Sequence, residues 1–254
     1  MRLTAFQERM EGYLTKALRE AKRHTSWVAP NEAYENTALG LLRAVLDPKS
    51  PFLERFGDLI RRLSTLGMLN GLTRTVLKLT LPGVPDIYQG TEFWDFSLVD
   101  PDNRRPVDYA ARAKALEKSD TLTALMGTWT DGRIKQRIIA ALLQDRAQSP
   151  VLYAEGNYQT LEAGGAHANH LLAYVRQHGT DALAVIVPRL WASLMKSNDP
   201  PVDASIWGDT SIELAQGHWL NVITGTEIVI DQDRTKISGL MKEVPFAILR
   251  LRHS

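Results

Sequence analysis

Apolar residues in the first half of the chain recur with the period of an α-helix. Along residues 3–23, and again along residues 51–80, they fall three and four positions apart, which places them on one helix face. The pair Asn70 and Gly71 lies within the second segment and predicts a break in it. Residues 109–118 are rich in strong helix formers and predict a further helix. The first half is therefore expected to be helical, with one exception.

The exception is the segment LPGVPDIYQG at residues 81–90. Its pattern predicts a turn followed by a short buried strand, Asp86 to Tyr88, that ends at Gly90. A buried strand needs neighbours that bond its backbone N–H and C=O groups, and no other segment of the first half offers one. The sequence therefore predicts that the missing strands belong to a longer polypeptide, of which this chain is the C-terminal piece.

The second half changes to the period of β-strands. A helix over residues 131–146, capped by Asp131, precedes short apolar segments that are separated by turn residues. Two of these segments, HLLAYVR and ALAVIVP, flank the residues HGTD at 178–181, which favour a hairpin turn. Three more strand-like segments follow, TSIEL, WLNVITG and PFAILRL. This pattern predicts an antiparallel, sandwich-like β region.

Composition excludes several classes of protein. Lys and Arg total 30 against 29 Asp and Glu, so the chain has no broad positive field with which to bind nucleic acid or an acidic membrane. No apolar run approaches the ~20 residues that a membrane helix needs. The absence of cysteine excludes disulfides and thiolate chemistry and suits a reducing compartment. We expect a soluble, cytoplasmic protein that binds neither nucleic acid nor membrane.

Residues 81–109 carry the densest group of candidate functional side chains, LPGVPDIYQGTEFWDFSLVDPDNRRPVDY. The form P-G-x-P-x-x-Y-x-G-x-E in its first part resembles the eighth strand of the (β/α)8 barrel of the α-amylase family. The continuation, DIYQGTEFWDFSLVDPDNRRPVDY, resembles the maltooligosyl trehalose synthase family nearly residue for residue. EAKRHTSWVAPNEAYE, HLLAYVRQHG, ALAVIVPRL and WGDTSIEL are similar to further stretches of that family. On these motifs the chain is identified as a member of it.

The resemblance implies an α+β fold. A helical segment with the last βα unit of a (β/α)8 barrel would precede an all-β, antiparallel, sandwich-like C-terminal domain. Residues 1–118 would form the C-terminal part of the barrel region, with the eighth strand and its loop. Residues 119–254 would form a helical connection and the C-terminal β domain.

The resemblance also implies an isomerase of trehalose biosynthesis. The family converts the reducing-end α-1,4 linkage of a maltooligosaccharide to α,α-1,1 by retaining, intramolecular transglucosylation. Its nucleophile, its acid and its third acidic residue lie on barrel strands that have no matching region in this chain. No residue is therefore assigned a catalytic role, and the chain alone is expected to be inactive. The resemblance implies a maltooligosaccharide as partner of the full-length enzyme, with no cofactor and no metal.

The acidic and arginine-rich stretch is expected to bind substrate. In relatives with D-P-x-N-R after the eighth strand, the Asp and the Arg hold a glucose, which assigns sugar contacts to Asp100 and Arg104. A carboxylate accepts from two vicinal hydroxyls, and a guanidinium presents forked donors to sugar oxygens. The remaining candidates for substrate binding are Glu92, Trp94, Asn103 and Arg105. The alternative is a salt-bridged brace within the loop, because exposed Asp–Arg pairs contribute little and usually serve as scaffold.

Other motifs are interpreted as structural. His167 and His170 form H-x-x-H without a third ligand, so they are not assigned to zinc. Trp27 and Tyr34 are interpreted as buried packing residues rather than as residues of a substrate groove. The tryptophans of the second half are expected in the core: Trp191, Trp207 and Trp219.

A second function class stays open, a non-catalytic carbohydrate-binding or scaffolding module with no barrel parent. The two classes differ in whether a barrel with three acidic residues at its strand ends accompanies the chain.

Overall fold

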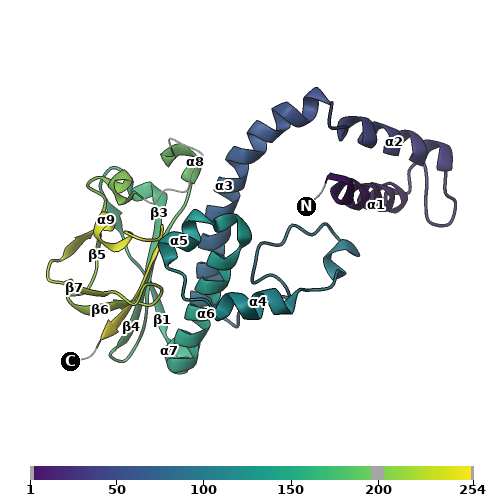
Figure 1. Cartoon of the computed structure of the whole chain (residues 1–254). Coiled ribbons are helices and arrows are strands. Elements are labelled where there is room, and N and C mark those ends of the chain that lie inside the picture. The colour runs from purple at the N-terminus through teal and green to yellow at the C-terminus, as the bar shows by residue number, and fades with distance from the viewer. Residues whose placement is uncertain (1–2, 196–202, 253–254) are drawn as a thin grey trace. The chain divides into compact units, whose positions relative to one another are not determined.

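A computed structural model describes residues 3–195 and 203–252. The contacts within the chain divide it into two compact units. Unit 1 comprises Met1–Leu63 and Asp95–Val107, and unit 2 comprises Ser64–Trp94 and Asp108–Ser254. Figure 1 labels the elements of both units.

Unit 1 consists of a helix pair, the first part of a third helix and a loop. Its elements are α1 (Leu3–Ala21), α2 (Glu32–Val45), the part of α3 (Pro51–Thr80) before Ser64, and the 3-10 turn η1 (Asp102–Arg104). The predicted helix over residues 3–23 is confirmed as α1.

Two arginine–glutamate pairs join α1 to α2. Arg43 donates from Nε and Nη2 to the two carboxylate oxygens of Glu11, both at 2.9 Å. Arg19 donates in the same forked manner to Glu35, both at 2.8 Å, and Glu35 is only 5% exposed. Helix α1 contains no fully buried residue. These forked pairs, which fix distance and orientation together, therefore contribute much of what holds the two helices in register.

Helix α3 differs from its prediction in two ways. It continues without interruption through Asn70 and Gly71, so the predicted break is wrong. Leu69 and Leu72 on either side are buried, and their packing outweighs the weak helix propensity of glycine. The predicted apolar stripe is buried only in the second part of the helix, since Phe52 and Phe56 in the first part are exposed.

Unit 2 contains the remainder of α3 and the other helices. These are α4 (Tyr109–Leu116), α5 (Leu122–Gly127), η2 (Trp129–Asp131), α6 (Arg133–Gln148), α7 (Pro150–Glu155), η3 (Ala168–His170), α8 (Trp191–Leu194), η4 (Ala204–Trp207) and α9 (Ile237–Leu240). The predicted helices at 109–118 and 131–146 are confirmed as α4 and α6. The predicted cap by Asp131 is wrong, because α6 begins at Arg133 with Gly132 as its N-cap and without a side-chain cap. Asp131 lies one residue earlier, and its Oδ1 accepts from the Arg133 N–H at 2.9 Å.

The strands of unit 2 form two antiparallel sheets. They are β1 (Asn157–Thr160), β2 (Ala163–Gly164), β3 (Leu171–His178), β4 (Asp181–Pro188), β5 (Ser211–Glu213), β6 (Gly217–Asn221), β7 (Glu227–Ile230), β8 (Arg234–Lys236) and β9 (Ala247–Arg252). One sheet has the order β1-β3-β4-β9-β6-β7 and the other β2-β5-β8. The α+β fold class with an antiparallel, sandwich-like second half is confirmed.

The centre of the larger sheet shows how the sequence specifies it. His178 pairs with Asp181, so Gly179 and Thr180 form the predicted hairpin turn between β3 and β4, and Gly179 has φ +58°. Strand β4 is buried along nearly its whole length, which explains its continuous apolar sequence ALAVIV. The tryptophans expected in the core, Trp191, Trp207 and Trp219, are buried.

The predicted strand from Asp86 to Tyr88 does not form. Neither helix nor strand is assigned to residues 81–101, and Tyr88 is 50% exposed rather than buried. No strand of the described residues pairs with this segment. The physical reason is the lack of partner strands: without neighbours, the backbone N–H and C=O groups of a strand cannot form a ladder of hydrogen bonds.

The predicted boundary after residue 118 lies within unit 2 and does not coincide with the division between the compact units. The assignment of residues 1–118 and 119–254 to two domains stays a prediction. No helix in the described part of the chain is long and apolar enough to cross a membrane.

One buried guanidinium ties the helices of unit 2 to the larger sheet. Arg176 on β3 is almost fully buried, and its six hydrogen bonds, of 2.8–3.3 Å, all end on main-chain carbonyls. Those carbonyls belong to the last residue of α3, to the end of α7 and to the start of β1: Thr80, Leu152, Tyr153, Gly156 and Asn157. Helix C-termini leave such oxygens without intrahelical partners, and a cation there is favourable.

Replacing Arg176 is expected to destabilise unit 2 severely. Arg176→Met leaves several buried carbonyls without donors, which we expect to lower the free energy of unfolding by at least about 3 kcal/mol. Arg176→Lys keeps the charge but loses the fork, so an intermediate loss is expected. Urea unfolding followed by circular dichroism measures both. Arg137→Met, on the exposed face of α6, is the control and should change stability little; equal stability of the two Met variants would contradict this role.

Candidate functional site

The structure places the acidic and arginine-rich stretch in two parts, residues 81–94 in unit 2 and residues 95–107 in unit 1. The candidates Glu92 and Trp94 therefore belong to unit 2. The candidates of the D-P-x-N-R segment, Asp100, Asn103, Arg104 and Arg105, belong to unit 1.

Basic side chains hold the part in unit 2. Arg146 on α6 donates to the carbonyls of Leu79 and Gly83, at 2.9 and 3.1 Å. Arg112 on α4 donates to the Gly90 carbonyl at 2.5 Å and to Glu92 Oε2 at 3.0 Å. These bonds replace part of the strand ladder that the sequence predicted. Glu92 therefore braces the loop here, and its role in sugar binding stays a prediction.

Trp94 is fixed by packing and one hydrogen bond. Its Nε1 donates to the Trp129 carbonyl at 2.5 Å, and Lys135 Nζ lies 5.7 Å from its ring centroid. A Cβ added to Gly71 would lie 3.3 Å from the indole. A Cβ added to Gly132 would lie 2.8 Å from the Trp94 nitrogen, and Gly132 has φ +81°. Trp94 thus packs between α3 and the start of α6, and its predicted role in substrate binding stays a prediction.

Asp102 is the centre of the part in unit 1. Arg9 on α1 donates from Nε to Oδ1 at 2.9 Å and from Nη2 to Oδ2 at 2.7 Å. The Leu98 N–H donates to Oδ2 at 2.6 Å, and Arg105 Nε lies 3.1 Å from Oδ1. Arg9 also donates to the Phe96 carbonyl at 2.8 Å. A single carboxylate therefore folds the loop and joins it to α1.

The same contacts shift the acidity of Asp102. The hydrogen bonds from Arg9 lower the pKa of the carboxyl to about 2, with a smaller contribution from the Leu98 N–H, while burial acts in the opposite direction. The charged form is therefore the one that the fold stabilises.

Asp100 and Arg104 lie at the surface of this loop. Their ion pair is open to solvent, with 46% of the Asp100 side chain and 72% of the Arg104 side chain exposed. Asn103 beside them is also exposed. An exposed pair of this kind contributes ~0–1 kcal/mol to stability, so the fold of the loop does not rest on it. Its donors and acceptors are arranged as hydroxyl recognition requires: a carboxylate next to a forked cation.

Sequence reasoning missed Phe96. It is 77% exposed in the same loop, whereas the neighbouring aromatic Trp94, which the sequence favoured, is largely packed. Phe96 therefore offers a ligand a more accessible apolar face than Trp94 does. The sequence F-W-D-F holds no signal that singles out Phe96, since period-2 alternation would place Trp94 and Phe96 on the same face.

The other sequence candidates have separate surroundings. Asp95 accepts from the backbone N–H and the hydroxyl of Ser97, and Asp108 caps α4 through the Ala111 N–H at 2.9 Å. The rings of His167 and His170 meet edge to face at 5.8 Å. Among the described residues, no group of three or more His, Cys, Asp or Glu is placed to hold a metal ion.

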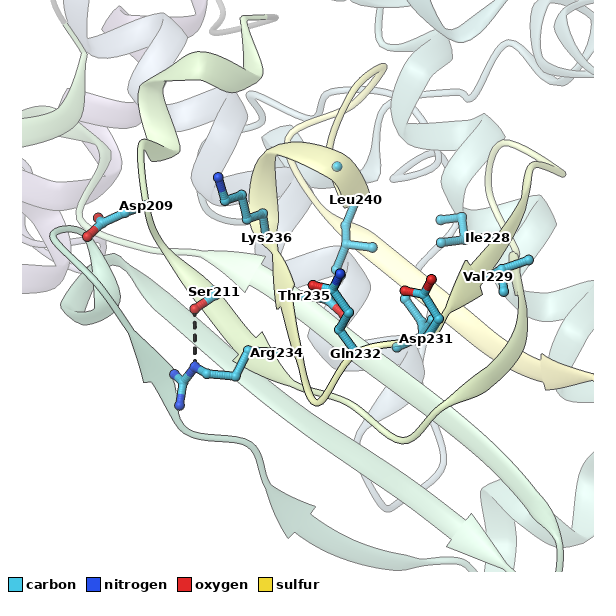
Figure 2. A pocket seen from close by; sticks show the side chains of 12 residues that line it. Asp209, Ser211, Ile228, Val229, Asp231, Gln232, Arg234, Thr235, Lys236 and Leu240 are labelled. Atoms are coloured by element: carbon cyan, nitrogen blue, oxygen red, sulfur yellow. Dashed lines mark hydrogen bonds between the residues drawn. The ribbon is translucent and has the colours of Figure 1, made fainter.

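A cavity of about 490 Å³ opens in the β region of unit 2, between β7, β8 and α9 (Figure 2). Its wall mixes charges of both signs, including Asp231, Lys236 and Arg234. Arg234 is already engaged with Ser211 and Glu213. No aromatic side chain is among the residues that line it, and none of the sequence-predicted site residues is there.

Comparison with known proteins shows which proteins this chain resembles in sequence and in structure. No protein-family model matches the sequence. A putative maltooligosyl trehalose synthase of Mycobacterium tuberculosis (strain CDC 1551 / Oshkosh) is 39% identical over 221 residues, which is 87% of this chain. The structure of maltooligosyltrehalose synthase from Arthrobacter ramosus superposes on 97% of the chain with a TM-score of 0.77 and 33% identity. Over most of its length the chain is therefore similar to maltooligosyl trehalose synthases.

The match covers only part of each relative. The chain spans 26% of the length of the M. tuberculosis protein and 30% of the A. ramosus protein. A hypothetical maltooligosyl trehalose synthase of Sulfolobus tokodaii gives a similar result, with a TM-score of 0.70, 28% identity and 29% of its length covered. Extents of this size fit the expectation of a C-terminal portion of a maltooligosyl trehalose synthase.

Gly132→Ala is expected to destabilise unit 2 by about 2–4 kcal/mol, because the new Cβ meets the Trp94 backbone and the residue must keep a left-handed conformation. Urea unfolding measures the loss. Gly127→Ala is the matched control, since a Cβ there meets nothing within 4 Å. If both variants unfold at the same urea concentration, the close packing of Gly132 against the Trp94 backbone does not contribute to stability.

The loop of unit 1 is expected to loosen in acid. A carboxyl whose pKa is lowered on folding stabilises the fold above its unfolded pKa of about 4, and this contribution is lost as the pH falls toward 2. Carbon-13 NMR titration of the Asp102 carboxyl should give a pKa near 2 in the wild-type chain. In Arg9→Met it should rise toward about 4. An unchanged titration in that variant would show that Arg9 does not hold the carboxylate.

Proposed function

We propose that this chain is the C-terminal region of a maltooligosyl trehalose synthase. The complete enzyme would convert the reducing-end α-1,4 linkage of a maltooligosaccharide to α,α-1,1 by retaining, intramolecular transglucosylation in the cytoplasm. The observation that carries the proposal is the superposition of 97% of the chain on the A. ramosus protein at 33% identity.

Within that enzyme, the chain would bind and position substrate rather than perform the bond rearrangement. Retaining enzymes use two carboxyls roughly 5–5.5 Å apart, one as nucleophile and one as acid. The carboxylates of the acidic stretch have other engagements: Glu92 with Arg112, Asp95 with Ser97, Asp100 with Arg104, Asp102 with Arg9 and Asp108 with the start of α4. The catalytic carboxyls would therefore come from parts of the polypeptide outside the matched region.

Asp100 and Arg104 are the proposed sugar contacts. They are exposed, they belong to a loop that Asp102 already folds, and their chemistry suits adjacent hydroxyls. Asn103, Arg105 and Phe96 would complete this surface. Because Asp102 rather than Asp100 holds the loop, a ligand can separate the Asp100–Arg104 pair without unfolding it.

A chimera tests the proposal. The matched region of the A. ramosus enzyme is replaced by this chain, and maltopentaose is assayed for loss of reducing ends. We expect activity, whereas the 254-residue chain alone should have none. An inactive chimera that folds and still binds maltooligosaccharide would instead support the non-catalytic carbohydrate-binding module.

Arg104→Ala in the active chimera should lower kcat/KM by a factor that corresponds to about 1–3 kcal/mol, because charge-assisted bonds to sugar are lost. Arg61→Ala is the control, since Arg61 forms a comparably exposed pair with Asp58. Equal kinetics for the two variants would remove Arg104 from the substrate site.

A further inference from the structure

The connection between α1 and α2 exposes four consecutive apolar residues, Trp27 to Pro30. Trp27 is 55% exposed and Val28 is 96% exposed, so the expectation that Trp27 is buried is wrong. The other five tryptophans of the chain are buried or half-buried. Runs of exposed apolar residues reduce solubility and are seldom kept without a function.

Hydrogen bonds give this connection a defined shape. The Ser26 N–H donates to the Ala29 carbonyl at 3.2 Å, and the Ala29 N–H donates to the Ser26 hydroxyl at 3.0 Å. The Asn31 N–H donates to Thr25 Oγ1 at 2.9 Å. Asn31 then caps α2 by accepting from the Tyr34 N–H at 3.1 Å. The apolar tip is therefore presented by a folded turn.

A fixed cation backs the Trp27 indole. The Arg19 guanidinium carbon lies 4.9 Å from the ring centroid, within the range of a cation–π contact. Glu35 holds that guanidinium through two bonds of 2.8 Å, and the Thr25 hydroxyl donates to Glu35 at 2.5 Å. Glu35 is buried, so the pair cannot easily rearrange. One side of the indole is thus set by an ion pair whose carboxylate is buried, while much of the ring remains exposed.

This arrangement suits an uncharged ring with an apolar face. The charges beneath the indole neutralise each other, which favours neither an anion nor a cation as ligand. A pyranose combines an apolar C–H face with hydroxyls at its rim. Tyr34, in the first turn of α2, is 37% exposed rather than buried as expected, and its ring centroid lies 5.0 Å from that of His24. Aromatic rings of this kind supply large contact area with little loss of conformational freedom.

We propose that Trp27 is a stacking platform for a glucosyl ring of an α-1,4-linked glucan. The proposal rests on the proposed function, because that function supplies the glucan. The platform belongs to the helix pair of unit 1 and uses none of the residues assigned above to sugar binding. Arg19 and Glu35 act through Trp27 as positioning residues.

Binding of maltoheptaose to the 254-residue chain tests the platform. Trp27 is the exposed tryptophan, so oxidation by N-bromosuccinimide should modify it first, and saturating maltoheptaose should slow that modification several-fold. Trp27→Ala should weaken maltoheptaose binding, measured by calorimetry, by about fivefold or more. Trp27→Phe should retain most of the affinity, because a flat apolar ring remains.

Two further variants separate positioning from folding. Arg19→Lys keeps the charge but loses the fork, so affinity should fall to an intermediate value while the helical circular dichroism stays that of the wild type. Tyr158→Ala, which removes an exposed aromatic of unit 2, is the control and should bind maltoheptaose as the wild type does. Wild-type affinity in Trp27→Ala, or oxidation that maltoheptaose does not slow, overturns the platform.

The outcomes distinguish this platform from the proposed function. An active chimera in which Trp27→Ala leaves maltoheptaose binding unchanged refutes the platform alone. An inactive chimera in which Trp27 still binds maltoheptaose refutes the proposed function alone. If the chimera protects Trp27 from oxidation without any glucan, the turn docks on the rest of the polypeptide, and the platform is refuted.

Discussion

The fold of unit 2 depends on the bonds from one guanidinium to the ends of two helices. Arg176 donates to the carbonyls that the ends of α3 and α7 leave without intrahelical partners, and so joins both helices to β3. Tyr174, two residues earlier on the same face of the strand, meets the Thr80 hydroxyl at 2.6 Å. Burial lowers the pKa of Arg176, since desolvation disfavours its charge. Its hydrogen bonds to main-chain carbonyls are the contacts that the buried guanidinium gains in place of water. The end of α3 is therefore fixed to the sheet, and the loop that follows starts from a fixed point.

Cation–carbonyl contacts continue along that loop. Arg146, Arg112 and Lys135 each donate to a backbone oxygen between Gly83 and Phe93. A segment without helix or strand needs such donors, because its own backbone supplies no regular partners. The apolar pattern around Tyr88 predicted a strand because a local pattern carries no information about the tertiary contacts of the segment. The contacts that decide the conformation come instead from α4 and α6, more than 20 residues away in the sequence.

Local signals were predicted well, and tertiary ones were not. The hairpin at Gly179 and the helix α4 each follow from residues within a few positions of one another. Gly71 leaves room for the Trp94 indole, which a Cβ there would approach to 3.3 Å and which lies 23 residues later in the sequence. In the same way, nothing near Asp102 in the sequence indicates that Arg9 is its partner. The motif drew attention to this loop, but only the contacts show that Asp102 folds it while the Asp100–Arg104 pair lies at its surface.

That distinction separates two roles within a single loop. Arg9 on α1 holds the Asp102 carboxylate, which folds the loop. The exposed Asp100–Arg104 pair contributes little to the same fold. Substitutions at the exposed positions therefore escape most of the selection that acts on folding. The outer surface of the loop can therefore change chemically while Arg9 and Asp102 keep its backbone in the same conformation.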